Sequence, residues 1–333
     1  MEGTDYGLVS PFFKINHEII MRKALFTIIT VLLASAATAD AQSVDTGKFM
    51  DTFIENFNSD RPENFNMHGS HRYFPNVPSL SEKGSDVMVM RINPETAAGA
   101  GRGPEIGTKK LTHFGTYKAR IRVPDVKKVQ PNVGAVVGYF TYRNDKTFKL
   151  SEIDFEWLIA DPTLIYVGTW TGNSDQRVGR TINLAKGEIL YTIWRKDGYD
   201  RGRNHNLTGE ANQPEKITAI PNYDASKRFY TYGFDWHPER LTWWIIHPET
   251  NEKIILWDYK GQVLIPEQPD FTGIPQSPTT YLLNYWHTNN WPVDTNSKSI
   301  EAPAYPYALE VDWMSYEPFV EESQEWINEN NWQ

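Results

Sequence analysis

Three acidic residues separated by single apolar residues form the stretch of this 333-residue chain that is best suited to chemistry. Glu152, Asp154 and Glu156 alternate with large apolar residues, which is the periodicity of a strand and not of a helix. Successive strand side chains point to opposite faces, so the three acids share one face, each about 6.7 Å from the next. Like charges at that spacing repel and Asp and Glu are poor strand formers, so stability alone does not favour this pattern.

Hydrolysis of a glycosidic bond needs two carboxyl groups in different protonation states, about 5–5.5 Å apart where the configuration is retained. The Cα atoms of Glu152 and Glu156 lie about 13 Å apart on an ideal strand, and side chains that lean toward each other close most of that gap. Asp154 would modulate both by hydrogen bonding and charge. The alternatives are a solvated face of an edge strand and a metal site. Apolar runs at 134–142 and 164–170 predict flanking strands, and hence a central position in a sheet.

The composition limits the partners of the protein. Its 12 Trp, 17 Tyr and 16 Phe suit both a sugar-binding surface and a packed core. The formal net charge of −9 disfavours nucleic acid as a partner, because phosphate binding needs a basic face, and it makes anionic polysaccharides less favourable. The chain has no cysteine, which excludes disulfides and thiol catalysis.

The first 41 residues are expected to lie outside the folded domain. Residues 21–41 have the layout of a secretory signal, with a basic start after Met21, an apolar run from Ala24 to Ala34 and small-residue cleavage options. The apolar run is too short to span a bilayer. Residues 1–20 are then an upstream extension or a misassigned start. We therefore expect a secreted or periplasmic protein with no membrane association after removal of the signal.

Residues 46–319 are expected to form one catalytic domain. Short apolar or alternating runs are broken there by Pro, Gly and Asn, with almost no sustained helical period. Many short strands separated by turn signals predict an all-β sandwich or barrel. Neither an internal repeat nor a Pro- or Ser-rich linker divides the region, and we expect a monomer. Residues 320–333 are predicted to be an acidic, polar tail without a function.

The stretch Glu152-Ile-Asp154-Phe-Glu156 resembles the active-site signature of glycoside hydrolase family 16. Its uninterrupted form is similar to the lichenase and xyloglucan-transferase branches, whereas laminarinase-like and agarase-like branches usually carry one extra residue before the last Glu. The resemblance covers about residues 50–318. It implies a β-jelly-roll sandwich of two antiparallel sheets, with the acidic strand in a concave substrate groove.

The resemblance also implies roles for individual residues. Glu152 would be the nucleophile, Asp154 the modulator, and Glu156 the acid/base that protonates the leaving oxygen and then deprotonates water. Two neighbouring carboxylates should raise the pKa of Glu156. No cofactor is expected for catalysis. Asp312, in the segment that resembles the closing strand of the family, would ligate a structural calcium ion or be a surface Asp without metal.

Five further residues stand where the family places its sugar-binding side chains: Glu105, Tyr142, Trp170, Asn284 and Trp286. For the three aromatic residues among them, packing in the core is the alternative. A Trp is well suited to cover the apolar face of a pyranose ring, because it offers a large rigid area and an N–H donor at one edge.

Departures from the family pattern concern the sides of the groove. The lichenase-like pattern has an arginine where this chain has Gly107, so either Arg102 substitutes from the glycine-rich loop or the subsite differs. The family commonly has His where Tyr230 stands. Residues 185–220 are longer than a compact lichenase needs, and Asp197-Gly198 indicates a hairpin inside them. This basic and aromatic insertion would wall the groove or form a solvated surface hairpin.

Together these patterns predict a retaining endo-acting hydrolase of β-glucan, with mixed-linkage β-1,3-1,4-glucan as the first substrate. The alternatives are a transglycosylase or hydrolase of xyloglucan, laminarin or another β-linked polysaccharide and, from another class, a noncatalytic carbohydrate-binding protein. The intact set of three acids disfavours the binding protein. No competing motif is present, neither His-Glu-x-x-His nor Gly-x-Ser-x-Gly.

Overall fold

The computed structural model describes most of the chain after residue 48. The described residues are 49–332 except 60, 70–72, 80–81, 83, 85, 173–175, 197–198, 204–215 and 262–271. The segments predicted as an extension and a secretory signal lie outside the described residues. In the described part, no helix has the length and apolar character needed to cross a membrane.

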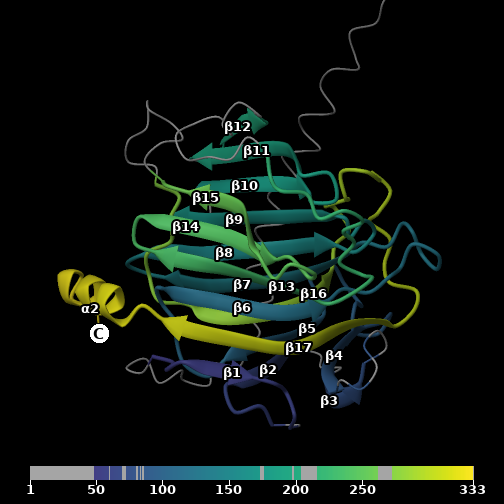
Figure 1. Cartoon of the computed structure of the whole chain (residues 1–333), viewed down its shortest axis with the longest axis horizontal. Coiled ribbons are helices and arrows are strands. Elements are labelled where there is room, and N and C mark those ends of the chain that lie inside the picture. The colour runs from purple at the N-terminus through teal and green to yellow at the C-terminus, as the bar shows by residue number, and fades with distance from the viewer. Residues whose placement is uncertain are drawn as a thin grey trace, which may run out of the picture.

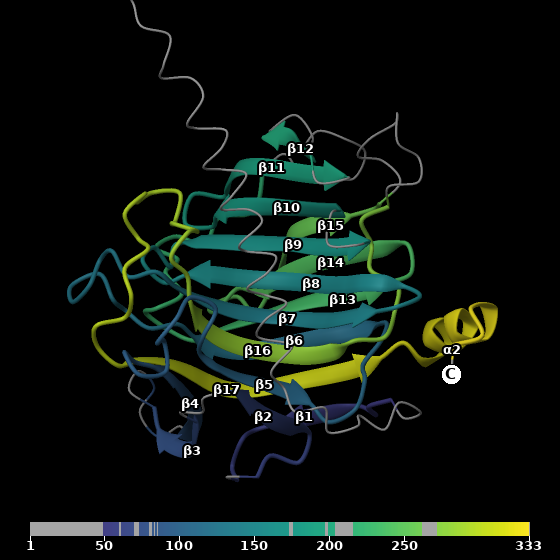
Figure 2. The ribbon, with the colours of Figure 1, turned by 180° about the vertical axis from the view of Figure 1, so that it is seen from behind.

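Two antiparallel sheets pack face to face, and the expected β-jelly-roll sandwich is confirmed (Figures 1 and 2). The nine-stranded sheet has the order β12 (Tyr199–Arg203), β11 (Glu188–Lys196), β10 (Gln176–Asn183), β9 (Leu164–Gly172), β8 (Lys149–Leu158), β7 (Ala135–Asp145), β16 (Thr280–His287), β5 (Pro104–Thr108) and β2 (Phe65–Gly69). The eight-stranded sheet has the order β15 (Lys253–Tyr259), β14 (Arg240–Ile246), β13 (Tyr230–His237), β6 (Gly115–Arg122), β17 (Tyr307–Pro318), β4 (Asp86–Ile92) and β3 (Tyr73–Pro78), with β1 (Phe53–Glu55) paired to β17.

Strand β8 is central in its sheet, and its apolar side chains enter the core between the sheets. Phe155 and Trp157 are fully buried there. From the opposite sheet, the indole Nε1–H of Trp243 on β14 donates to the backbone carbonyl of Asp154 at 3.0 Å. Trp157 in turn donates to the hydroxyl of Tyr223 at 3.2 Å. Because the core holds one face of β8, the carboxylates of the strand project from the other face.

The segment predicted as a polar tail forms a helix, α2 (Val320–Glu329), that packs on the sandwich (Figure 1). Trp326 is only 7% exposed and belongs to the main core, with its ring 5.0 Å from that of Phe148 and 4.9 Å from that of His113. The carboxylate of Glu322 lies 3.0 Å from His237. The helix is therefore part of the domain. A single anchoring aromatic side chain leaves no apolar period in the sequence, which is why the acidic composition suggested a tail.

The insertion predicted at residues 185–220 adds two strands at an edge of the nine-stranded sheet. Strands β11 and β12 pair antiparallel with Lys196 opposite Tyr199. The hairpin turn predicted at Asp197-Gly198 lies outside the described residues. Residues 204–215 lie outside the described residues, as do the side chains of residues 194–203. The role of the insertion in the groove stays a prediction.

Candidate active site

The three acids lie together on the face of β8 that points away from the core, here called the acidic face. Glu152 is 4% exposed and Asp154 is 6% exposed, whereas Glu156 is partly exposed. Strand β8 pairs with β7 on one side and β9 on the other over its whole acidic stretch. The predicted central position is correct, and the reading as an edge strand is wrong.

Aromatic side chains flank Glu152 on both neighbouring strands. Tyr142 on β7 and Trp170 on β9 are its cross-strand partners, and both are partly exposed. On β10, Arg177 faces Trp170, with its guanidinium carbon 5.0 Å from the centre of the indole. The sequence reasoning did not single out Arg177. Strand β10 follows β9 in the sequence, and every second residue of a strand points to the same face. Applying this alternation to β10 would have placed Arg177 on the acidic face.

A row of polar residues crosses the sheet at the level of Glu156. Its cross-strand partners are Gly138 on β7 and Tyr166 on β9. Beyond Gly138 the row continues with Asn284 on β16 and Glu105 on β5. The amide of Asn284 donates to the carboxylate of Glu105 at 3.4 Å. The structure thus brings two of the predicted sugar-binding residues into line with Glu156.

The absence of a side chain at Gly138 makes room for Asn284. A Cβ atom built at position 138 would lie 2.5 Å from the Oδ1 atom of Asn284. That oxygen is buried and accepts no hydrogen bond from the residues that the structure describes. A buried acceptor without a partner costs about 1–3 kcal/mol, so a bound hydroxyl that donates to it would be favoured.

Trp286 lies on the same sheet face but toward the Glu156 end rather than beside Glu152. It is 8% exposed and belongs to an apolar cluster that is separate from the main core. We call it the end cluster; its buried members are Val136, Leu158, Ala160, Leu164, Tyr166, Trp286 and Val293. Burial in this cluster favours a packing role for Trp286, and its role as a sugar platform stays a prediction.

The electrostatics of the acidic face favour protonated carboxyl groups. Burial raises the pKa of Glu156 to about 8, against the opposing charge of Arg177. Burial also raises the pKa of Glu152 and Asp154 well above their usual range, and the neighbouring carboxylates add to both shifts. For Glu156 the expected direction is therefore right, but the main cause is burial and not repulsion between charges. Burial likewise raises the pKa of Glu105 to about 7, although the hydrogen bond from Asn284 opposes this.

We expect Glu156→Gln to raise Tm by several degrees at pH 9 and to change it little at pH 4. The folded-state pKa of about 8 lies above the ordinary Glu value of about 4.3, so the folded protein binds more protons between these values. The stability that Glu156 contributes is complete below a pH of about 4.3 and is lost as the pH rises through about 8. Glutamine removes the titration. Thermal melts in a pH series check this, with exposed Glu239→Gln as the control. An equal gain at both pH values would contradict the assignment.

Asp312, the residue expected to ligate calcium, lies on β17 in the eight-stranded sheet and already pairs with a cation. Its carboxylate is 2.5 Å from the guanidinium of Arg120, which also binds Glu82 at 2.9 Å. Among the described residues, no three His, Asp or Glu side chains are grouped so that they would hold a metal ion. These donors do not fit a calcium ion, because Arg120 supplies the positive charge that an ion would bring. Calcium binding stays untested.

Chelation is therefore expected to leave the melting temperature of the purified protein unchanged. A metal that binds only the folded state adds stability, and its removal would lower Tm. The measurement is a thermal melt with and without excess EDTA, followed by addition of calcium or magnesium. A fall in Tm that calcium reverses and magnesium does not would show that a calcium site exists despite the Arg120 pairing.

Relatives of this chain share one description. The Bacillus subtilis (strain 168) protein called Beta-glucanase is 23% identical over 310 residues, which are 89% of this chain and 98% of that protein. The Acetivibrio thermocellus protein of the same name is 23% identical over 271 residues, 80% of this chain. The chain is similar over most of its length to these proteins. The match spans 62% of the length of the Acetivibrio thermocellus relative. No family model matches this chain.

Solved structures with a similar arrangement of strands carry related descriptions. The Bacillus licheniformis β-glucanase is 18% identical, with a TM-score of 0.48 over 81% of this chain and 99% of that one. A prokaryotic β-1,3-1,4-glucanase (lichenase) derived from a mouse hindgut metagenome is 17% identical, with a TM-score of 0.48 over 81% of this chain and 100% of that one.

One departure from the pattern of glycoside hydrolase family 16 can be placed in the structure. Gly107 lies opposite Leu282, two residues along β5 from Glu105. Arg102 is exposed, and its backbone carbonyl accepts a hydrogen bond from His287 at the end of β16. The glycine-rich loop is thus fixed beside β16. Substitution by the Arg102 side chain for the missing arginine stays a prediction.

Proposed function

We propose that this chain is a retaining, endo-acting glycoside hydrolase that cleaves β-glucan, with mixed-linkage β-1,3-1,4-glucan as its preferred substrate. The observation that carries the proposal is the set of three carboxyl groups on one face of a central strand, two of them buried and that of Glu156 partly exposed, with partly exposed aromatic side chains on both sides of Glu152. The relatives named Beta-glucanase support the substrate class. The uninterrupted motif supports mixed linkage over laminarin.

In the first step, Glu156 donates its proton to the glycosidic oxygen while the carboxylate of Glu152 attacks the anomeric carbon. The bond to the leaving sugar breaks and a glycosyl ester of Glu152 forms. In the second step, Glu156 takes a proton from water, whose oxygen attacks the anomeric carbon and frees Glu152. Two inversions give net retention. The raised pKa of Glu156 keeps the required proton at neutral pH.

Asp154 has a place between the two glutamates in this scheme. Three ionised carboxyl groups on one strand face would repel one another strongly, and burial raises the pKa of all three. A proton kept on Asp154 lowers the repulsion that the ionised Glu152 meets. The aspartate thereby helps the nucleophile to carry its charge while Glu156 stays protonated.

Features beside the acids suit a hydroxyl-rich polymer. The buried acceptor oxygen of Asn284 would receive a hydrogen bond from a sugar hydroxyl, and Glu105 next to it would bind another. Tyr142 and Trp170 offer partly exposed rings that can cover the apolar faces of pyranose rings. A chain laid across the strands would meet both groups together with the acids.

The deciding assay is release of reducing ends from a panel of polysaccharides. The panel holds mixed-linkage β-glucan, laminarin, xyloglucan and cellulose, and we expect the highest rate on the first. Endo action should lower the viscosity of the solution early, before small sugars accumulate. A noncatalytic binding protein would retain polysaccharide in a pull-down and release no ends. A transglycosylase would instead change the chain lengths with little net release.

The location and assembly of the protein are part of the proposal. We infer that it is secreted or periplasmic and acts as a monomer. The signal-like residues 21–41 support secretion, and the presence of the three acids on one strand supports a site that needs no second subunit.

A further inference from the structure

The segment that joins β16 to β17 covers one end of the acidic face with residues 288–299. Val293 in this segment is buried in the end cluster. Trp291 packs against the same cluster, with its ring edge-to-face on Tyr166 at 5.3 Å between centroids and 6.5 Å from Trp286. The segment thus lies on the sheet face that carries the acids and not on the core.

Trp291 is one side chain away from the expected proton donor. Tyr166, its contact, is the cross-strand partner of Glu156. The indole of Trp291 is only partly buried. It therefore presents ring area beside the position where a leaving sugar would accept its proton.

Asp294 fastens the segment to the sheet on the side of the acidic face. Its Oδ2 atom accepts hydrogen bonds from the hydroxyl of Tyr166 at 3.0 Å and from the hydroxyl of Tyr191 at 2.7 Å. Both tyrosines face Thr181 on β10 from either side, so one carboxylate spans three strands. Two hydrogen bonds to a charged acceptor hold this part of the segment more firmly than neutral pairs would.

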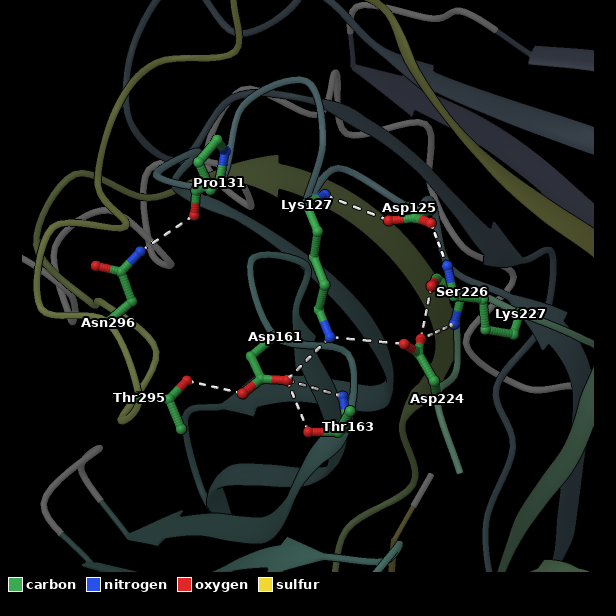
Figure 3. A network of polar contacts seen from close by, with 10 residues as sticks. All are labelled: Asp125, Lys127, Pro131, Asp161, Thr163, Asp224, Ser226, Lys227, Thr295 and Asn296. Atoms are coloured by element: carbon green, nitrogen blue, oxygen red, sulfur yellow. Dashed lines mark hydrogen bonds and ion pairs between the residues drawn. The ribbon is translucent and has the colours of Figure 1, made fainter. Parts of the chain in front are cut away.

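Further contacts fasten the segment to loops at the same end of the strands (Figure 3). Thr295 donates to the carboxylate of Asp161 at 2.8 Å, and Asn296 donates to the backbone carbonyl of Pro131 at 3.1 Å. Asp161 is also 3.7 Å from the ammonium of Lys127. Residues of the sheet and of the adjoining loops therefore hold the segment in one position, and a fixed ring loses little conformational freedom when a ligand binds.

We propose that Trp291 is a sugar-stacking residue on the leaving-group side of the scissile bond, held in place by the bonds from Asp294 to the two tyrosines. The inference rests on the proposed function, because Glu156 as proton donor defines which side that is. A flat indole suits the apolar face of a pyranose ring. The alternative is that Trp291 only covers the end cluster.

The test compares two substrates that differ in the leaving group. Mixed-linkage β-glucan leaves as a sugar chain, whereas an aryl β-glycoside of a gluco-oligosaccharide leaves as a phenol. We expect Trp291→Ala to lower kcat/KM on the polymer by about tenfold or more and to change it less than about twofold on the aryl glycoside. Trp291→Leu, which keeps apolar contact with Tyr166, should give the same selective loss. Tyr305→Ala, an exposed aromatic residue beyond residues 288–299, is the control.

Each outcome of the comparison decides the inference. Equal losses on both substrates would show a purely structural role and overturn it. Unchanged rates on the polymer in both variants would overturn it as well. The proposed function would stand in that case, because the wild type would still cleave the polymer. A wild-type protein that cleaves neither substrate would remove both the proposed function and the inference.

Discussion

Glu152→Gln and Glu156→Gln are each expected to lower kcat/KM on β-glucan by about a thousandfold or more, which corresponds to about 4 kcal/mol of barrier. Neither carboxylate can perform the task of the other, since one forms the bond to carbon and the other moves the proton. Glutamine keeps the shape of each side chain, so the fold should persist. Steady-state kinetics and thermal melts on the same preparations check both points.

Azide, a small nucleophile, distinguishes the role of Glu152 from that of Glu156 in variants that carry alanine at one of these positions. In Glu152→Ala, azide takes the place of the nucleophile and inverts the sugar once, so an α-glycosyl azide is expected. In Glu156→Ala, azide attacks the glycosyl ester of Glu152, so a β-glycosyl azide is expected. Glu188→Gln, an exposed acid on β11, is the control and should keep the wild-type rate. Wild-type rates in either glutamine variant would remove the mechanism.

Trp286→Ala and Trp170→Ala are expected to affect different properties, the first mainly stability and the second mainly KM. Trp286 is packed in the end cluster, and loss of a packed Trp typically costs about 3–5 kcal/mol of stability. Trp170 is partly exposed under Arg177, so its loss should cost less stability and mainly raise KM on β-glucan. A sugar-contacting role of Trp286 would add a fall in kcat in the protein that stays folded.

Melting curves and kinetics on both variants decide between packing and sugar contact. Trp332→Ala is the matched control. It removes another partly buried Trp, which lies far from the acidic strand in the sequence, and it should lower stability without changing the kinetics. A large loss of stability in Trp170→Ala with unchanged KM would show that this residue is structural. Retained stability in Trp286→Ala would contradict its packing in the end cluster.

Most of what could be predicted came from the alternation of acidic and apolar residues along one strand. A period of two placed Glu152, Asp154 and Glu156 on one face, and the apolar runs on either side predicted the flanking strands that β7 and β9 provide. The many turn signals predicted the all-β architecture. These features depend on residues that are close in the sequence, so the sequence alone shows them.

Contacts between distant segments could not be predicted in the same way. Arg177 joins the acidic face only through the register of β10 on β9, and Trp326 joins the core only because α2 folds back on the β7–β8 hairpin. Trp291 and Asp294 lie more than a hundred residues from Tyr166 and Tyr191, the tyrosines that they contact. The effect of burial on the pKa of Glu156 likewise needs the whole fold.

The central claim is that Glu152 and Glu156 act in two successive inversions at one anomeric carbon. Proton NMR of the products in the first minutes of hydrolysis of mixed-linkage β-glucan tests it most directly, before the released sugars equilibrate in water. The account predicts that the new reducing ends appear first as the β anomer, with the α anomer growing in later. An α anomer as the first product would contradict it.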